Sequence, residues 1–238
     1  MKNILLLDYD HTLYPSTLPT LRAVDQRINL YIRTYLGFTA EGADALRLRL
    51  WDKYGTTLKG LEELHGVDRG HYCDFIHAID ALHLPPPDAA LRAWLAGMPH
   101  PCYIFTNARM DWPVRGLKAM GLGAMLPEAL APELADLGDV AEGLSVPRLQ
   151  GIFDIAYMDW DGKPNPSGYA KVDAHLRERH GGDLRIHFAD DRRDNLESAR
   201  ARGWRTLWVA PHDAPAVRGD EFDRVVKSLT DLDPVTLS

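Results

Sequence analysis

Short apolar runs alternate with helical stretches through the second half of this 238-residue chain, and this pattern restricts the fold more than any other feature. Alternation of this kind is typical of a parallel sheet whose strands are joined by crossover helices. The apolar run Ile4–Leu7 near the N-terminus has the same character, so we assign it to the same sheet. The other predicted strands are Cys102–Phe105, Phe153–Tyr157, Ile186–Ala189 and Thr206–Val209. The predicted fold class is α/β, with a Rossmann-like parallel-sheet core.

Residues 14–87, which follow the first strand, have a helical pattern instead. Their apolar residues recur every third or fourth position, which predicts four short helices. Gly37 ends the first of these helices, and Thr57 is the expected N-cap of the third. Ligands of parallel sheets bind at the carboxyl ends of the strands. A helical insertion directly after the first strand should therefore lie over that edge as a cap, with residues 1–13 and 88–238 forming the α/β catalytic core.

Residues 123–150 interrupt the core with a segment rich in Leu, Ala, Pro and Gly, in which acidic residues outnumber basic ones. The segment precedes a predicted strand, so it should lie at the amino edge of the sheet, away from the ligand edge. We interpret it as an acidic insertion that serves as surface decoration or as an oligomer contact. A second substrate lid is the alternative.

The composition fits one sizeable core, or a core plus a smaller appended domain, since 45% of the residues are hydrophobic. A net charge of −7 argues against a broad surface for a nucleic-acid polymer. The N-terminal apolar run is too short for a signal peptide or a membrane span, so we expect no membrane partner and a cytoplasmic location. Cys73 and Cys102 are expected to be reduced and buried. A monomer and a homodimer are both compatible with the sequence.

Polar residues follow the predicted strands at their carboxyl ends. Asp8 and Asp10 come after the first strand and point the same way, because side chains alternate along a strand. Taken alone, this pair could be only a polar strand end with a turn at His11. The other strands lead, directly or within a few residues, to Thr106, Asn107, Lys163, Asp190 and Asp191. Because parallel strands end at one edge, we expect all of these side chains to gather there.

Converging carboxylates repel one another, which raises their pKa values unless a divalent cation neutralises them. Carboxylate ligands suit Mg²⁺, and the sequence has no His or Cys cluster that would favour zinc. We therefore predict a Mg²⁺ site. Lys163 adds a positive charge that can keep Asp8 ionised and bind a phosphoryl oxygen.

Four short motifs, in order along the chain, resemble those of the haloacid dehalogenase (HAD) superfamily of phosphohydrolases. They are Asp8-x-Asp10-x-Thr12, the strand-end Thr106, Lys163 in a Lys-Pro-x-Pro turn, and Asp190-Asp191 followed by Asn195. The resemblance implies that Asp8 is a nucleophile that forms an aspartyl-phosphate and that Asp10 is the acid/base. It implies that Thr106 and Lys163 bind phosphoryl oxygens. It also implies that Mg²⁺ is held by Asp8, the backbone carbonyl of Asp10 and Asp190, with Asp191 acting through water or as an orienting group.

The second Asp also separates reaction types within the superfamily. Its dehalogenating members use one Asp and no metal, whereas its phosphatases carry the second. By this resemblance, Asp10 favours a phosphatase over a dehalogenase.

Residues 54–61, 8–14 and 105–108 further resemble the pyrimidine 5'-nucleotidase branch of the superfamily. In that case the cap covers a nucleoside monophosphate. The candidates for substrate contact are then Tyr14, Thr56, Thr57, Lys59 and Asn107. Thr57 as a mere helix cap and Lys59 as a solvated charge are the competing interpretations. Arg109 is either a second phosphate clamp or a surface residue, and His11 stands where Asn is common in that branch.

The expected activity is Mg²⁺-dependent hydrolysis of a small phosphorylated metabolite, with a nucleoside 5'-monophosphate favoured. A sugar-phosphate phosphatase or a phosphomutase of similar architecture is the first alternative. A non-catalytic binding protein of the same fold is the second.

Overall fold

The computed structural model describes residues 1–126, 149–212, 214 and 221–234. Its strands form one parallel sheet in the order β3-β2-β1-β4-β5-β6. Their bounds are β1 Lys2–Leu7, β2 Cys102–Phe105, β3 Ile152–Phe153, β4 Leu184–Asp190, β5 Arg205–Val209 and β6 Arg224–Val226. The predicted α/β class with a Rossmann-like core is confirmed.

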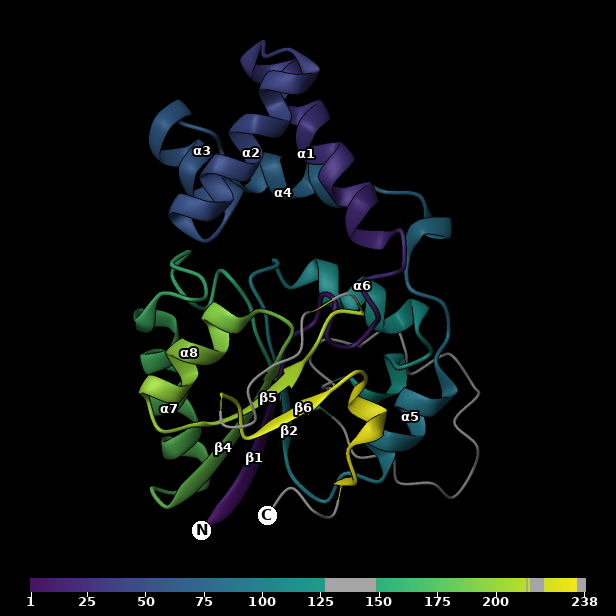
Figure 1. Cartoon of the computed structure of the whole chain (residues 1–238), viewed down its shortest axis with the longest axis vertical. Coiled ribbons are helices and arrows are strands. Elements are labelled where there is room, and N and C mark those ends of the chain that lie inside the picture. The colour runs from purple at the N-terminus through teal and green to yellow at the C-terminus, as the bar shows by residue number, and fades with distance from the viewer. Residues whose placement is uncertain (127–148, 213, 215–220, 235–238) are drawn as a thin grey trace.

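Helices cover both faces of this sheet, as Figure 1 shows. They are α5 Ala89–Ala96, α6 Asp111–Ala119, α7 Pro166–His180 and α8 Arg193–Ala201. Leu5 and Leu7 of β1 belong to the buried cluster that includes α5 and α6. Ile4 and Leu6 belong to the other cluster, with α7 and α8. Alternate side chains of β1 thus serve opposite faces, which explains why the whole strand is apolar.

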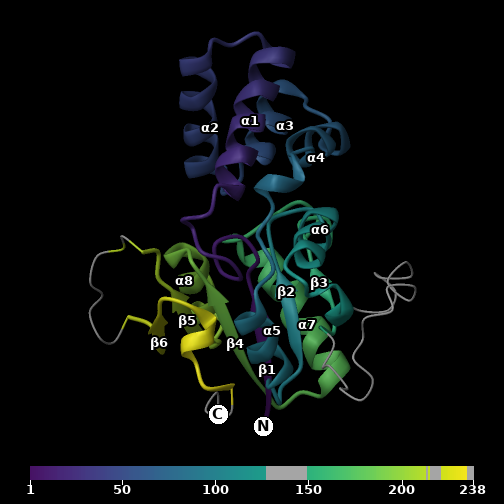
Figure 2. The ribbon, with the colours of Figure 1, turned by 90° about the vertical axis from the view of Figure 1, so that its right-hand side faces the viewer.

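The helices between β1 and α5 lie together above the carboxyl ends of the strands (Figures 1 and 2). They are α1 Thr20–Leu36, α2 Ala40–Tyr54, α3 Thr57–His65 and α4 Arg69–His77, followed by the 3-10 helix η1 Ala81–His83. Gly37 ends α1 with a left-handed φ of 74°, as predicted. We call residues 14–87 the cap and residues 1–13 and 88–238 the core, and we propose these boundaries as those of two units.

Two local predictions are wrong. Thr56, rather than Thr57, is the N-cap of α3, since its side chain accepts a hydrogen bond from the Lys59 backbone N–H. The third strand ends at Phe153 and does not reach Tyr157. The Asp154 carboxylate accepts hydrogen bonds from the backbone N–H groups of Met110 and Tyr157, and these bonds turn the chain out of the sheet.

Both cysteines, Cys73 and Cys102, are free and buried, as predicted. Residues 127–148, which make up most of the predicted acidic insertion at 123–150, lie outside the described residues. Among the helices that the structure does describe, none has the length and apolar character needed to cross a membrane.

Candidate active site

The register of the central strands places the first two carboxylates side by side. Leu7 of β1 is paired with Ala189 of β4. The next residues along these strands are therefore Asp8 and Asp190, and the Asp8 backbone N–H donates to the Ala189 carbonyl at 2.9 Å. Both carboxylates are buried, and both residues stand at the carboxyl ends of their strands. The cap helices lie above this edge of the sheet (Figure 1). The sequence prediction that strand-end carboxylates gather at one edge is confirmed for this pair.

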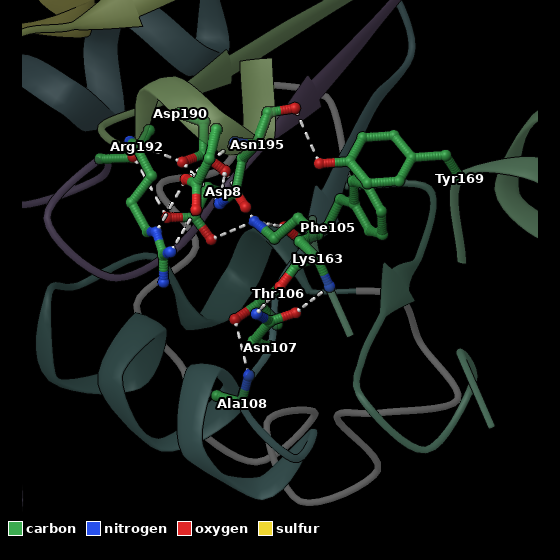
Figure 3. Close-up of polar contacts among 12 residues, drawn as sticks. Asp8, Phe105, Thr106, Asn107, Ala108, Lys163, Tyr169, Asp190, Arg192 and Asn195 are labelled. Atoms are coloured by element: carbon green, nitrogen blue, oxygen red, sulfur yellow. Dashed lines mark hydrogen bonds and ion pairs between the residues drawn. The ribbon is translucent and has the colours of Figure 1, made fainter. Parts of the chain in front are cut away.

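Lys163 lies between these two carboxylates (Figure 3). Its ammonium donates to Asp8 Oδ1 and to Asp190 Oδ2, each at 2.7 Å, and to the Phe105 carbonyl at 2.8 Å. Burial alone would lower the pKa of Lys163, but the charges of Asp190 and Asp8 raise it by more than burial lowers it. The net shift of the pKa is upward, and the ammonium stays charged. An ammonium has three N–H groups, and all three have acceptors here. A direct bond from Lys163 to a phosphoryl oxygen would therefore have to replace one of these partners.

The Asn107 side chain forms hydrogen bonds with the backbone of Lys163. Its Oδ1 accepts from the Lys163 backbone N–H at 2.7 Å, and its Nδ2 donates to the Lys163 carbonyl at 2.8 Å. A Cβ at Gly162 would lie 2.6 Å from Asn107 Oδ1, so this close approach requires glycine. Both polar atoms of the Asn107 side chain are occupied, and its contact with substrate stays a prediction.

The two threonines of the motifs, Thr12 and Thr106, are both buried. Thr12 donates to Asp8 Oδ2 at 3.3 Å, which completes the contacts of the Asp8 carboxylate. Thr106 follows β2 and accepts from the Ala108 backbone N–H at 3.1 Å, so its own hydroxyl hydrogen remains available as a donor. Its role as a phosphoryl ligand stays a prediction.

Asp8, Asp190 and Asp191 offer carboxylate oxygens that lie within 4.8 Å of one another. Burial raises the pKa of Asp8 to about 6 and that of Asp190 to about 6, and Lys163 opposes both shifts. Burial also raises the pKa of Asp191. This cluster holds three carboxylates, the Lys163 ammonium and the His11 ring, whose Nδ1 lies 3.7 Å from Asp191 Oδ2. A divalent cation with a preference for oxygen ligands fits the three carboxylates. The predicted Mg²⁺ site thus has three of its carboxylates in place.

The orientation of Asp190 is fixed by neighbours on α8 and at its start. The Asn195 side chain donates to both carboxylate oxygens at 3.0 Å, and the Arg192 backbone N–H donates to Oδ1 at 2.8 Å. Asp190 is 0% exposed, so these donors replace the water that an ionised carboxylate would otherwise bind. Asn195, which the sequence motif included, therefore acts on Asp190.

Asp10 lies outside this carboxylate group, although its backbone carbonyl remains a predicted Mg²⁺ ligand. Its Oδ1 accepts hydrogen bonds from the Tyr14 hydroxyl and from Trp112 Nε1, the latter at 3.0 Å. Tyr14 thus contacts Asp10, and its predicted contact with substrate stays untested by this geometry. Trp112 is not among the predicted site residues, because nothing in the local pattern of α6 indicates which side chain reaches back to the residues after β1.

Two predicted substrate residues of the cap, Thr56 and Thr57, form hydrogen bonds within α2 and α3. Thr56 caps α3, and the Thr57 hydroxyl donates to the Arg47 carbonyl at 3.4 Å. The turn that precedes them nevertheless contacts the core, because a Cβ at Gly55 would lie 3.2 Å from the Lys163 carbonyl oxygen. A substrate contact of Thr56 or Thr57 stays a prediction.

Lys59 and Arg109 both form ion pairs between the cap and the core. Lys59 of α3 forms an ion pair with Asp161, two residues before Lys163. Arg109, which follows the Thr106 strand end, pairs with Asp74 of α4 and with Asp111. Lys59 is therefore not simply a solvated charge, and Arg109 is occupied by carboxylates rather than presented as a phosphate clamp.

No protein family model matches this sequence. An L-2-haloacid dehalogenase of known structure is 13% identical, with a TM-score of 0.56 and 100% of each chain covered. The HAD-hydrolase YfnB from Bacillus subtilis, solved bound to magnesium, is 15% identical, with a TM-score of 0.54 over 97% of this chain and 96% of that one. The chain has the haloacid dehalogenase fold.

A third structure has the same fold. It is the L-2-haloacid dehalogenase from Xanthobacter autotrophicus with chloropropionic acid covalently bound, which is 16% identical, with a TM-score of 0.50 over 99% of this chain and 97% of that one. Identities this low establish the fold alone. The predicted resemblance to the superfamily is confirmed at that level, and the pyrimidine 5'-nucleotidase branch remains a proposal.

Proposed function

We propose that this protein is a Mg²⁺-dependent phosphomonoesterase that acts on a small phosphorylated metabolite, most favourably a nucleoside 5'-monophosphate. One observation carries the proposal. The buried Asp8 carboxylate lies 2.7 Å from the Lys163 ammonium. Carboxylate oxygens of Asp8, Asp190 and Asp191 lie within 4.8 Å of one another. This is a nucleophile combined with the oxygen ligands that suit a divalent cation.

Charge separates phosphate chemistry from dehalogenation, the activity named for two of the three neighbours. A 2-haloacid carries a carboxylate of its own, which would enter a cluster where three carboxylates already face the Lys163 ammonium and the His11 ring. For a phosphate ester, Mg²⁺ held by the same carboxylates would offset the charge of the ester. Asp10, the residue that the resemblance assigns to phosphatases, is present and held by two donors.

In the proposed mechanism, Asp8 attacks phosphorus and forms an aspartyl-phosphate as the phosphorus–oxygen bond to the leaving group breaks. Asp10 gives its proton to the departing oxygen and then takes a proton from the water that attacks the aspartyl-phosphate. Phosphate is released and Asp8 is regenerated. Lys163 holds Asp8 ionised and oriented throughout.

Asp8, Asp190 and Asp191 would hold Mg²⁺, with the Asp10 carbonyl as a further ligand. The cation supplies positive charge that offsets the charge of the phosphoryl oxygens and of the clustered carboxylates. Thr106, with its hydroxyl hydrogen free to donate, would bind one phosphoryl oxygen.

The nucleotide preference is supported by the cap. Residues 54–61 carry the resemblance to the nucleotidase branch, and the turn at Gly55 within them contacts the Lys163 carbonyl. This segment therefore lies beside the turn that carries Lys163. A nucleoside is a leaving group large enough to reach this segment.

A substrate panel tests the proposal. The purified protein is incubated with nucleoside 5'-monophosphates, sugar phosphates and 2-haloacids, each with Mg²⁺ and with chelator, and phosphate or halide release is measured. We expect phosphate release that needs Mg²⁺, is highest with a nucleotide and is abolished by Asp8→Asn. Halide release that persists in chelator would replace the proposal with dehalogenation.

The same panel separates the remaining alternatives. A preference for sugar phosphates over every nucleotide would contradict the nucleotide assignment and leave the phosphatase. Isomerisation of a sugar phosphate without free phosphate would indicate a phosphomutase. No turnover of any substrate would indicate a binding protein with the same fold.

A further inference from the structure

The acid/base candidate Asp10 is held by one of its two carboxylate oxygens. Oδ1 accepts hydrogen bonds from the Tyr14 hydroxyl and from the Trp112 indole N–H. Among the residues that the structure describes, no group donates to Oδ2. Trp112 is 1% exposed and Tyr14 is 3% exposed, so water does not compete for these two donors.

The approach of α6 to the loop after β1 is a second, independent observation. A Cβ at Gly116 would lie 1.5 Å from the Tyr9 hydroxyl, so only glycine allows helix and loop to come this close. Gly116 follows Trp112 by one helical turn and lies on the same face. One face of α6 therefore packs closely against Tyr9 and delivers the indole to Asp10.

The plane of the indole is fixed as well. The Trp112 ring stacks on the ring of His77, the last residue of α4, with centroids 5.0 Å apart and planes at 19°. Arg115, also on α6, donates to the carbonyls of His77 and Ile79. The indole is thus clamped between the core and the chain segment that leaves the cap.

Both donors act on the same oxygen of Asp10. The Trp112 indole N–H can only donate, and the Tyr14 hydroxyl donates its hydrogen to Oδ1. Both groups can therefore orient the carboxylate that transfers the proton.

We propose, resting on the phosphatase function above, that Tyr14 and Trp112 are positioning residues that anchor Asp10 by Oδ1 and leave Oδ2 to carry the proton. The proton on Oδ2 passes to the leaving oxygen as its bond to phosphorus breaks. Oδ2 then takes a proton from the attacking water. Without the two donors the carboxyl group can rotate, and the proton is no longer aimed at the leaving oxygen.

The leaving group provides the test. A nucleoside 5'-monophosphate releases an alkoxide that needs protonation, whereas p-nitrophenyl phosphate releases a stable phenolate that does not. For Trp112→Phe and Tyr14→Phe, we expect kcat/KM with Mg²⁺ to fall about 10-fold or more on the nucleotide and less than about 3-fold on p-nitrophenyl phosphate, a part of the roughly 10²- to 10⁴-fold typical of general acids. The ratio kcat/KM is used because it reports the steps up to leaving-group departure.

Matched variants control for the loss of a buried ring contact. Trp94 donates to the Leu232 carbonyl at 2.7 Å, and the Tyr103 hydroxyl pairs with His180, both away from Asp10. Trp94→Phe and Tyr103→Phe should change kcat/KM by equal factors on the nucleotide and on p-nitrophenyl phosphate. Equal losses on both esters in Trp112→Phe and Tyr14→Phe would overturn the positioning role and leave the phosphatase assignment intact. A wild-type protein inactive on every phosphate ester would overturn the proposed function and, with it, this inference.

A measurement without turnover covers variants that fold poorly. The assigned indole N–H signal of Trp112 in the NMR spectrum of ¹⁵N-labelled protein should shift in Asp10→Ala, which removes the acceptor. It should stay in place in Asp159→Ala, since Asp159 is exposed and pairs with Lys171. A Trp112 signal unchanged in Asp10→Ala would show that the bond is absent in solution and would overturn the proposal.

Discussion

The carboxyl edge of the sheet and the underside of the cap are held by opposite kinds of contact. At the sheet edge, the Lys163–Asp190 pair is 1% and 0% exposed. Between cap and core, the Lys59–Asp161 pair is 34% and 35% exposed. Partly exposed pairs contribute about 0–1 kcal/mol each, whereas breaking a buried pair costs several times more. The groups proposed for chemistry are therefore fixed, and the Lys59–Asp161 pair is weak enough to break and reform.

One aromatic contact between cap and core is also partly exposed. The guanidinium of Arg192 lies 4.1 Å from the ring centroid of Trp51, which is 45% exposed. A cation–π contact at such a site contributes about 0.5–1 kcal/mol. The stack of Trp112 on His77 is buried instead. The exposed contacts can break to admit substrate without disturbing the cluster around Asp8.

The largest expected effect comes from Lys163→Met. Removing the ammonium leaves two buried carboxylates without a counter-charge, so we expect the free energy of unfolding to fall by about 3–5 kcal/mol. Phosphate release should fall by about 10²- to 10³-fold or more, as when an oriented donor is lost from other enzymes. Urea unfolding and a Mg²⁺-dependent phosphatase assay measure the two losses. The control is Lys171→Met, which removes an exposed ion pair with Asp159 and should leave both nearly unchanged. Wild-type stability in Lys163→Met would contradict the contrast between the two regions.

Asn107→Ala should have the next largest effect. Losing the two bonds to the Lys163 backbone should cost about 1–3 kcal/mol of stability and lower kcat, with little change in KM. Asn165→Ala, which removes one bond to the Gly162 carbonyl in the same turn, should do less. If KM rises while kcat is kept, Asn107 contacts substrate, as its place in the sequence motif first indicated.

Arg109→Met probes the cap side of the comparison. The substitution removes the link to Asp74 and to the Gly70 carbonyl of α4, yet Asp74 is 70% exposed. We expect less than about 1 kcal/mol of lost stability, with KM changed more than kcat because cap closure is affected and the chemistry is not. A loss of kcat as large as that of Lys163→Met would place Arg109 among the groups that act on phosphate.

The smallest effect is expected from the Lys59–Asp161 pair. A double-mutant cycle with Lys59→Met and Asp161→Asn should give a coupling energy of about 0–1 kcal/mol, which falls as salt is raised. Chemical denaturation at low and high ionic strength measures it. A coupling above about 2 kcal/mol would mean that the cap is fixed to the core as firmly as the buried cluster is.

The same contrast explains what the sequence could and could not predict. Asp8 and Asp190 were predictable because a parallel sheet brings its strand ends to one edge whatever the details of helix packing. Lys163 lies well beyond the end of β3 and was predictable from its Lys-Pro-x-Pro motif. The anchoring of Asp10 was not, since it depends on how closely α6 approaches Tyr9, and a single glycine at position 116 decides that distance. Local side-chain bonds account for the boundary errors, as with the Asp154 bonds that end β3 and the choice between two adjacent threonines as the N-cap of α3.

The central claim is that Asp8 forms the covalent bond to phosphorus. A rapid-quench experiment with Mg²⁺ and substrate labelled with ³²P at the phosphate, followed by acid trapping and peptide mapping, tests it most directly. We expect transient label on the peptide that carries Asp8, and no label in Asp8→Asn. Steady phosphate release without labelled protein, or label on another residue, would contradict it.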